Sequence, residues 1–217
     1  MQNSKSLNSH ERKFLHDSVL SPSYDAFMLT RKPDIAAVKY MNDIFSVLPY
    51  FTCPDSSSTN VSTVFSDMKC FCLHYGYPIL LKGIHCYARM CYSWEQVCER
   101  ITASALGKDG MFLQQYVSGL EVTFAFSAYK GELLGCVKMT KNKFFEEGKV
   151  WSGTLDAVPP NIYKGIQGFV TQSNYTGGGE IECIFEIMAG KYYLIDFNPR
   201  FPAWIYASSY TSLNLVG

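Results

Sequence analysis

Acidic side chains alternate with apolar ones near the C-terminal end of the chain, in the stretch GGGEIECIFEIMAGKYYLIDFNPR. Successive side chains of a β-strand point to opposite faces of a sheet, so Glu180 and Glu182 are expected on one face. A turn centred on Ala189 would fold this stretch into a hairpin. If the hairpin is symmetric about that residue, Glu182 lies opposite Asp196 and Glu180 lies opposite Asn198.

The same alternation predicts the two faces of the return strand. The side that carries the acids should hold Tyr192, Leu194, Asp196 and Asn198. The opposite side should hold Tyr193, Ile195 and Phe197.

Two carboxylates that face each other across a strand pair repel, and this destabilises a sheet unless a cation lies between them. Mg²⁺ is the natural candidate, because it binds carboxylate and phosphate oxygens. Arg200 follows Asn198 by two residues, and a guanidinium can bind a phosphate through two parallel hydrogen bonds. The alternation also fits a hairpin whose polar face is simply solvated. The residues alone leave both interpretations open.

With these residues in this order, the chain resembles the ATP-grasp superfamily, and most of all the branch of biotin carboxylase and the carbamoyl-phosphate synthetase large subunit. In that family a strand acid and an acid-x-Asn-x-Arg element hold the metal ions and the triphosphate. Asp196 stands where the family more often has Glu. The resemblance implies ATP and Mg²⁺ as cofactors, with Mn²⁺ as a substitute. It assigns the metal to Glu182, Asp196 and Asn198, and makes Arg200 a catalytic and ATP-binding residue.

Other parts of the chain resemble the family's nucleotide-binding elements, in the same order. The strand YPILLKG resembles a strand that ends on an ATP-phosphate lysine, so Lys82 is implied as a catalytic and ATP-binding residue. The segment FLQQYVSGLEVTFAF resembles the family's hinge. It implies adenine contacts from the segment Gln114, Gln115, Tyr116 and Val117, and a ribose contact from Glu121. Lys32 fits an earlier phosphate-binding lysine. Each of these residues would also be ordinary on a solvated strand or surface.

The resemblance implies an α+β chain with the ATP-grasp fold, in which two α+β lobes grip ATP between them. Residues 1–31 would be a tail or the remnant of a preceding domain, and 32–217 the ATP-grasp domain. The smaller, lid lobe is expected at about 77–117, and the larger, catalytic lobe at about 118–217.

The implied activity is that of an ADP-forming carboxylate–amine ligase, which activates a carboxylate as an acyl phosphate and joins it to an amine. Two departures keep an alternative open, a non-catalytic ATP-binding subunit or partner module. The run after Lys82, KGIHCYARMCYS, has one glycine where many relatives have a glycine-rich loop. Only 31 residues precede Lys32, where family ligases usually carry another domain. A partner chain or a homodimer could supply that domain.

Bulk composition fits this class of protein. The 19 basic and 19 acidic residues balance, which disfavours a nucleic-acid or polybasic membrane surface. None of the eight cysteines forms a C-x-x-C pair, which disfavours zinc. The polar N-terminus lacks a signal sequence, and no apolar run approaches the roughly 20 residues that span a bilayer. We therefore expect a cytoplasmic protein that acts on small molecules, with no nucleic-acid or membrane partner.

Helices and strands are predicted in a mixed order, without a regular βαβ repeat, which indicates the α+β class. A first helix should begin near Pro33, with an apolar stripe of Val38, Met41, Phe45 and Leu48. A second should cover 62–75 and end near Gly76. A third should follow a capping box of Ser93 and Gln96, and a fourth should open at Pro159-Pro160 with Ile162, Ile166 and Val170 on one face.

Strands are predicted at 78–82, at 112–117, from Leu120 onward and at 132–139, in addition to the acidic hairpin. The alternation of Leu120, Val122, Phe124 and Phe126 is typical of a half-buried strand. Lys130-Gly131 should form the turn into the next strand. The run Gly177 to Gly179 is interpreted as a flexible connection before the acidic hairpin.

Overall fold

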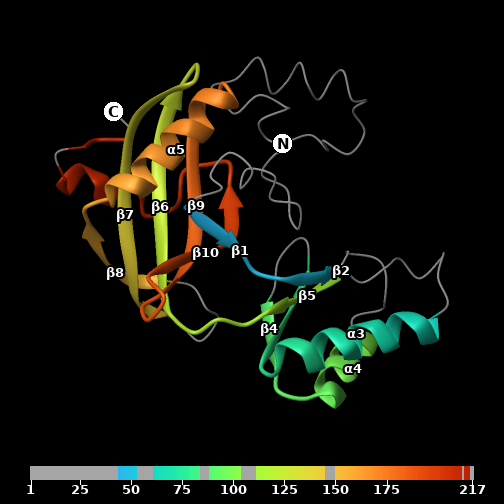
Figure 1. Cartoon of the computed structure of the whole chain (residues 1–217). Helices are drawn as coiled ribbons and strands as arrows, with labels where there is room; N and C mark the ends of the chain where they lie inside the picture. The colour runs from blue at the N-terminus through green and yellow to red at the C-terminus, as the bar shows by residue number, and fades with distance from the viewer. Residues whose placement is uncertain are drawn as a thin grey trace, which may run out of the picture. The chain divides into compact units, whose positions relative to one another are not determined.

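The computed structural model describes residues 44–52, 61–83, 88–103, 111–144, 150–211 and 213–215. The chain divides into two compact units. The smaller unit is Leu48–Ser118, and the larger unit combines the chain up to Val47 with Gly119–Gly217. Figure 1 shows the elements of both units along the chain. The two units are described one at a time.

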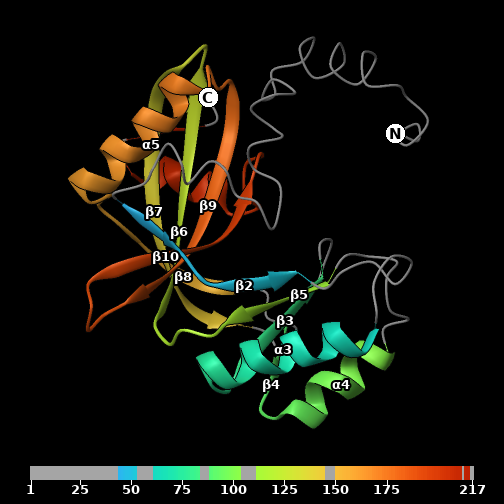
Figure 2. The ribbon, with the colours of Figure 1, turned by 45° about the vertical axis from the view of Figure 1, so that its right-hand side comes forward.

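The larger unit is built on a six-stranded sheet in the order β1-β10-β9-β6-β7-β8. Its strands are β1 (Phe45–Val47), β6 (Leu120–Tyr129), β7 (Glu132–Phe144), β8 (Val150–Asp156), β9 (Gly177–Glu186) and β10 (Lys191–Asn198). β1 runs parallel to β10, and the other pairs are antiparallel. Helix α5 (Pro160–Gln172) lies across one face of this sheet (Figures 1 and 2). A short 3₁₀ helix, η3 (Ile205–Tyr210), follows β10.

The β6–β7 hairpin turns at Lys130 and Gly131, as the sequence predicts. Both residues have positive φ, 47° and 81°. Two consecutive positive φ angles are the mark of a type I′ turn, whose twist matches that of the strands it joins. This turn therefore sets the first pairs of the hairpin, beginning with Tyr129 opposite Glu132.

Helix α5 begins at Pro160, close to the predicted start, because proline suits the first helical turn. Its predicted apolar stripe is confirmed, since Ile162, Ile166 and Val170 are all buried. They pack with apolar side chains of the sheet. The core between helix and sheet is Phe45, Val122, Phe124, Phe126, Ala128, Leu133, Cys136, Ile162, Ile166, Phe169, Val170, Tyr175, Ile181, Cys183, Leu194 and Phe197.

The smaller unit pairs a four-stranded antiparallel sheet with two helices. The sheet order is β2 (Tyr50–Thr52), β5 (Met111–Gln115), β3 (Ile79–Gly83) and β4 (Ala88–Cys91). The helices are α3 (Val61–Tyr75) and α4 (Trp94–Ala103). Their separate core is Met68, Cys72, Ile79, Leu81, Cys91, Val97, Ile101, Met111 and Leu113.

Both helices of the smaller unit match the sequence prediction. α3 stops before Gly76, whose φ of +75° is the left-handed value that commonly ends a helix. At the start of α4, the Ser93 hydroxyl accepts the N–H of Gln96 at 3.3 Å. The Gln96 side chain accepts the N–H of Tyr92 at 2.9 Å. The predicted cap is therefore present, with the glutamine reaching one residue further back than in a standard capping box.

Three predictions about the helices, strands and connections differ from the structure. Phe45 lies in β1 rather than in a helix, because pairing beside Tyr192 buries it in a sheet core; residues 33–43 of that predicted helix lie outside the described residues. The strand predicted at 112–117 ends at Gln115. The glycines from Gly177 to Gly179 open β9 instead of forming a connection.

Close packing explains those glycines. A Cβ atom on Gly179 would lie 2.3 Å from Cζ of Phe126, and one on Gly178 would lie 2.5 Å from the Phe201 ring. Contacts this short are incompatible with any larger residue unless a ring moves. The absence of side chains at these glycines lets one aromatic ring pack closely on each face of the strand.

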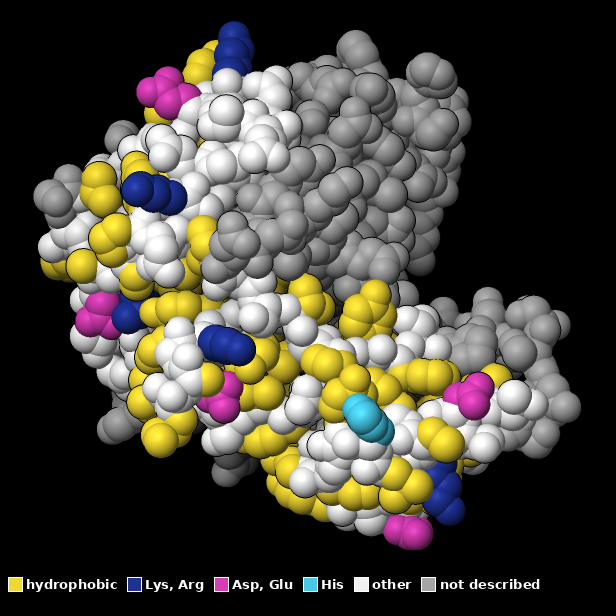
Figure 3. Space-filling view, viewed as in Figure 1, with side chains coloured by type: hydrophobic (Ala, Val, Ile, Leu, Met, Phe, Trp, Pro, Cys, Tyr) yellow, Lys and Arg dark blue, Asp and Glu magenta, His cyan; other side chains and the backbone are white. Residues whose placement is uncertain are grey.

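The α+β class is confirmed. Within the described residues, no helix is both long and apolar enough to cross a membrane. On the face shown in Figure 3, charged side chains are scattered among apolar and polar ones instead of forming one patch of a single sign.

Candidate functional site

Strands β9 and β10 bring the predicted metal residues together. Asp196 is the direct partner of Glu182, and Asn198 is the direct partner of Glu180. Both pairings were predicted from the sequence and are confirmed. The four residues lie on the sheet face opposite α5.

A β-bulge at Ile195 produces this register. Pairing runs regularly to Leu194 opposite Cys183, and the next pair is Asp196 opposite Glu182. An extra residue in one strand reverses the alternation of side chains beyond it. Leu194 and Phe197 therefore both enter the helix-side core, where they are 1% and 3% exposed. The prediction that Tyr192 and Leu194 share a face with the acids was wrong for this reason, whereas Phe197 lies opposite the acids as predicted.

The two faces of the sheet can now be named by their residues. The helix face carries Val122, Phe124, Phe126, Cys136, Ile181 and Cys183, which pack under α5. The acid face carries Glu121, Thr123, Lys141, Glu180, Glu182, Asp196 and Asn198. Next to these residues the same side of the sheet turns apolar, and Ala125 and Val137 pack with Ile205 and Leu215 of the C-terminal segment.

Glu180 is the most buried acid of this face, with 5% of its surface exposed. It accepts hydrogen bonds from the Thr123 hydroxyl at 3.0 Å, from Nδ2 of Asn198 at 3.2 Å and from Nε1 of Trp204 at 3.2 Å. Burial raises the pKa of Glu180, and the nearby charge of Glu182 raises it further, although the hydrogen bonds act in the opposite direction. Glu180 thus holds the side chains of Thr123, Asn198 and Trp204 in position rather than reacting with a substrate.

The Asn198 amide is held by two acids at once. Its Nδ2 also donates to Oε1 of Glu182 at 3.3 Å. Because the nitrogen is turned toward the acids, the amide oxygen points away from them, and oxygen is the atom that a hard cation binds. On the neighbouring residue, Oδ1 of Asp196 accepts the N–H of Phe197 at 2.9 Å, which restrains that carboxylate.

Lys141 of β7 places a cation among these acids. Its Nζ lies 3.1 Å from Oε2 of Glu182 and 3.4 Å from Oε2 of Glu121, and its side chain is 11% exposed. Burial by itself lowers the pKa of Lys141, but the charges of Glu182 and Glu121 outweigh it, and the net pKa lies above the usual value. Lys141 is therefore a stable positive charge, and it joins the predicted ribose acid to the predicted metal acid.

Arg200, the last residue of the predicted acid-x-Asn-x-Arg element, lies apart from this network. Arg200 is exposed, and its Nη1 donates to the carbonyl oxygen of Phe201 at 3.1 Å. Its phosphate role stays a prediction.

Lys82 and the predicted adenine segment, Gln114 to Val117, belong to the smaller unit. Lys82 lies near the end of β3, opposite Ala88 and Phe112. Gln114 is 6% exposed, and its Oε1 is buried without a hydrogen-bond partner among the described residues. A buried acceptor without a donor destabilises a fold, so this oxygen is suited to a ligand that brings an N–H group.

Four further predicted residues remain, three of them at or just beyond the end of β5 and the fourth outside the described residues. The N–H of Gln115 donates to the carbonyl oxygen of Pro49 at 3.0 Å. Tyr116 is exposed and Val117 half-buried, and both follow the last residue of the strand. Lys32 lies outside the described residues.

The acid face fits a divalent cation that also binds an external ligand. Among the described residues, no group of three or more His, Cys, Asp or Glu side chains is arranged to hold a metal by itself. Glu182 and Asp196 offer two facing carboxylates, and Asn198 offers an amide oxygen. Mg²⁺ suits such a partial set, because it is commonly held by one or two carboxylates and completed by phosphate oxygens and water.

The sequence prediction did not assign Lys141, Thr123 or Trp204 to the acid face. The hairpin count did place Glu180 opposite Asn198, but it gave Glu180 no role in the site. Lys141 could not be found by counting from the turn. A bulge between Ser127 and Ala128 shifts the β6–β7 register by one residue, so the count misplaces it.

No protein-family model and no curated protein matches this chain. Solved structures do match. The biotin carboxylase domain of the Hydrogenobacter thermophilus 2-oxoglutarate carboxylase, solved as a dimer with MgADP, ADP and bicarbonate, is 17% identical with a TM-score of 0.73. The match covers 96% of this chain and 49% of that one.

Two further solved structures are similar to this chain. The N5-carboxyaminoimidazole synthase of Aspergillus clavatus, solved with ADP and 5-aminoimidazole ribonucleotide, has 12% identity and a TM-score of 0.67, over 91% of this chain and 52% of that one. The D-alanine–D-alanine ligase of Bacillus anthracis, solved with ATP, has 12% identity and a TM-score of 0.56, over 82% and 59%. This chain thus spans about half the length of the structures it matches, and the likeness is one of fold.

Proposed function

We propose that this chain, which has the ATP-grasp fold, binds ATP with Mg²⁺ at the acid face and uses it to activate a carboxylate for ligation to an amine. The observation that carries the proposal is the bulged β9–β10 pair, which sets Glu182 against Asp196 and Asn198 beside them. A core residue in place of either acid would be easier to accommodate, because facing carboxylates repel. The presence of both acids on facing positions supports a cationic ligand.

In this proposal Glu182, Asp196 and the Asn198 oxygen hold the metal. Mg²⁺ neutralises charge on the phosphate oxygens when it is bound. Glu180 keeps the Asn198 oxygen turned outward through its bond to Nδ2, and Trp204 and Thr123 keep Glu180 in place. Glu121 on the same face is the proposed partner of the ribose hydroxyls.

The smaller unit is proposed to contribute adenine and phosphate contacts. The orphaned Oε1 of Gln114 is suited to accept a hydrogen bond from the adenine amino group. Lys82 is proposed to bind phosphate, as is Lys32, and the segment from Gln115 to Val117 is proposed to contact the adenine. Gln114 gives this assignment its support, because an unsatisfied buried oxygen is a liability that a bound ligand removes.

The proposed reaction has two steps. An oxygen of the substrate carboxylate bonds to the γ-phosphorus of ATP while the bond to the ADP oxygen breaks, giving an acyl phosphate and ADP. The amine nitrogen then attacks the acyl carbon, phosphate leaves, and the nitrogen loses a proton. Lys82 and Arg200 are the proposed catalytic residues, because positive groups near the transferring phosphoryl group stabilise its charge.

A second candidate is a nucleotide-binding module that does not turn ATP over by itself. It is favoured by the sequence that follows Lys82, in which Gly83 is the one glycine before Ser93. A partner chain or a second copy would then complete the enzyme. The dimer of the biotin carboxylase domain offers a precedent for association in a protein of this fold.

Release of ADP and phosphate tests the ligase proposal. The purified chain would be incubated with MgATP and a panel of small carboxylic acids and amines, including amino acids. The proposal expects ADP release that requires both an acid and Mg²⁺, and a product in which the two substrates are joined. Tight MgATP binding without release under every pair would favour the second candidate, and release that ignores the acid would contradict the proposed reaction.

A further inference from the structure

Lys141 has no role in the proposed function so far, although it lies in the centre of the acid face. It comes from β7, whereas Glu121 comes from β6 and Glu182 from β9, so its ammonium group joins three strands. The contact to Glu182 at 3.1 Å is the shorter of the two. A second positive charge at Glu182 would have to share that carboxylate with Lys141.

The charge balance of the face explains why a cation is built in. Glu121, Glu180 and Glu182 lie close together with a single lysine, and Lys141 is also within electrostatic reach of Glu180. Removing the lysine would leave partly buried like charges facing one another, which destabilises the folded state. The ammonium group offsets this repulsion when no other cation is present.

We propose that Lys141 is a stand-in cation, which holds Glu121 and Glu182 together in the empty site, gives up Glu182 when the divalent ion binds, and then faces the phosphates of ATP. The inference rests on the proposed function, because it uses the same metal acid and the same nucleotide. It adds a competition between the chain's own ammonium group and the metal for one carboxylate.

This competition makes two affinities move in opposite directions. Without Lys141, a divalent ion alone should bind more tightly, because it no longer has to displace an ammonium group and meets more negative charge. ATP without any divalent ion should bind more weakly, because the face loses its one built-in cation. A lysine with a purely structural role would weaken both ligands when it is removed.

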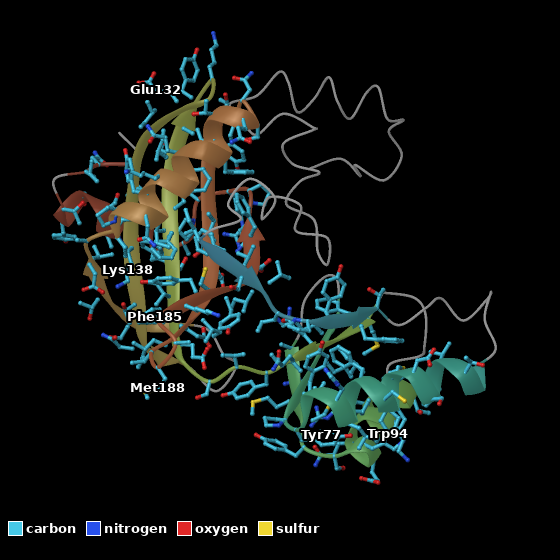
Figure 4. All side chains as sticks on the ribbon, viewed as in Figure 1. Tyr77, Trp94, Glu132, Lys138, Phe185 and Met188 are labelled. Carbon is cyan, nitrogen blue, oxygen red and sulfur yellow. The ribbon has the colours of Figure 1, made fainter. Side chains whose placement is uncertain are left out.

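Lys138 supplies a matched control on the same strand. Lys138, which is labelled in Figure 4, is opposite Phe124 and so lies on the helix face of the sheet. Its Nζ is 3.4 Å from Oδ2 of Asp156. Its removal takes away the same charge from β7 without touching the acid face. An effect shared by both lysines would be a long-range charge effect, and not a competition for Glu182.

The test uses Lys141→Met, Lys141→Arg and Lys138→Met in the full chain, with thermal unfolding to verify that each is folded. Mn²⁺ binding without nucleotide is measured by electron paramagnetic resonance, and ATP binding in the presence of EDTA by calorimetry. Charged hydrogen bonds of this kind change affinity by roughly tenfold. We expect Lys141→Met to tighten Mn²⁺ and weaken metal-free ATP by about that factor, while Lys141→Arg and Lys138→Met stay near wild type.

A double-mutant cycle with Glu182→Gln identifies the carboxylate. In the Glu182→Gln background, Lys141→Met should no longer tighten Mn²⁺, because the contested ligand is absent. The inference is overturned if Lys141→Met weakens Mn²⁺ or leaves it unchanged, or if Lys138→Met reproduces its effect. Failure of the proposed function would give a different result, because wild type would then show no Mg²⁺-dependent ATP binding. The Mn²⁺ affinities of wild type and Lys141→Met would still decide the role of Lys141.

Discussion

The helix face and the acid face of the six-stranded sheet are formed by alternate residues of the same strands, yet they are filled in opposite ways. On the helix face, Phe124, Phe126 and Phe169 are fully buried, and the rings of Phe126 and Phe169 each meet that of Phe197 edge to face. On the acid face, Glu180 and Lys141 are nearly as buried but are satisfied by hydrogen bonds and ion pairs. Two neighbouring positions on one strand thus face unlike surroundings.

The difference separates stability from binding. Apolar burial contributes about 25 cal/mol per Å² and needs no partner, so the helix face can hold the sheet together by itself. A partly buried carboxylate pair contributes little or opposes folding. In the proposed function the charges of the acid face serve a ligand, on a sheet that the helix face stabilises.

Thiol labelling gives the largest contrast between a closed surface and an open one. Cys136 and Cys183 belong to the helix face, and burial raises the pKa of the Cys136 thiol to about 12. Cys70 is exposed on α3. Because the buried thiols react through opening of the fold, we expect them to be labelled at least about 1000-fold more slowly than Cys70 at pH 8. Mass spectrometry of timed labelling with a maleimide measures this, and equal rates would show that the helix face is open.

Removing a ring from the helix face should have the largest effect on stability. Phe169→Ala deletes a fully buried ring of α5 and should lower the free energy of unfolding by about 3–5 kcal/mol, because a cavity remains. Urea denaturation measures it. Lys164→Ala, an exposed position on the same helix, serves as the control and should change stability by less than about 0.5 kcal/mol. A loss below about 1 kcal/mol for Phe169→Ala would mean that α5 contributes little to the fold.

The paired glycines compare the two faces directly. Gly179→Ala meets Phe126, which is fully buried, whereas Gly178→Ala meets Phe201, which is only half-buried. Overpacking usually costs about 1–3 kcal/mol, and we expect Gly179→Ala at the upper end and Gly178→Ala at the lower end of that range. Chemical denaturation of both variants ranks them, and the reverse order would break the comparison.

A single hydrogen bond on the acid face should have the smallest effect. Trp204→Phe removes the N–H that donates to Glu180 but keeps an aromatic ring, so a loss of about 1 kcal/mol in unfolding free energy is expected. In a Glu180→Gln background the loss should shrink, because the acceptor is no longer charged. Thermal or urea unfolding of the four proteins of this cycle tests the coupling, and fully additive losses would show that the charge of Glu180 does not strengthen the bond.

Much of the fold could be predicted because its signals are local. The Lys130-Gly131 turn, the start of α5 at Pro160 and the end of α3 at Gly76 each depend on residues with restricted backbone preferences. The Glu182–Asp196 pairing followed from turn counting, although the bulge at Ile195 lies within the counted stretch. The pairs between the turn and the bulge are centred half a residue before Ala189. The extra residue in the bulge cancels this difference, so the pairs beyond it are centred on Ala189 as the count assumed.

Other features depend on packing that a single sequence does not display. The bulge at Ile195 sends Leu194 and Phe197 to one core, and strict alternation cannot anticipate it. The bulge beside Ser127 hides the approach of Lys141 to Glu121. The strand at Phe45 is set by its partner β10, which lies nearly 150 residues away along the chain. Long-range pairing decided each of these features.

Binding of Mn²⁺ with ATP to the acid face tests the central claim most directly. Electron paramagnetic resonance of Mn²⁺ in the presence of ATP would be compared between wild type, the Glu182→Gln/Asp196→Asn double variant and Lys138→Met. The account predicts that wild type and Lys138→Met bind the MnATP complex equally, and that the double variant loses at least about 100-fold in affinity while remaining folded. Unchanged MnATP affinity in the folded double variant would contradict it.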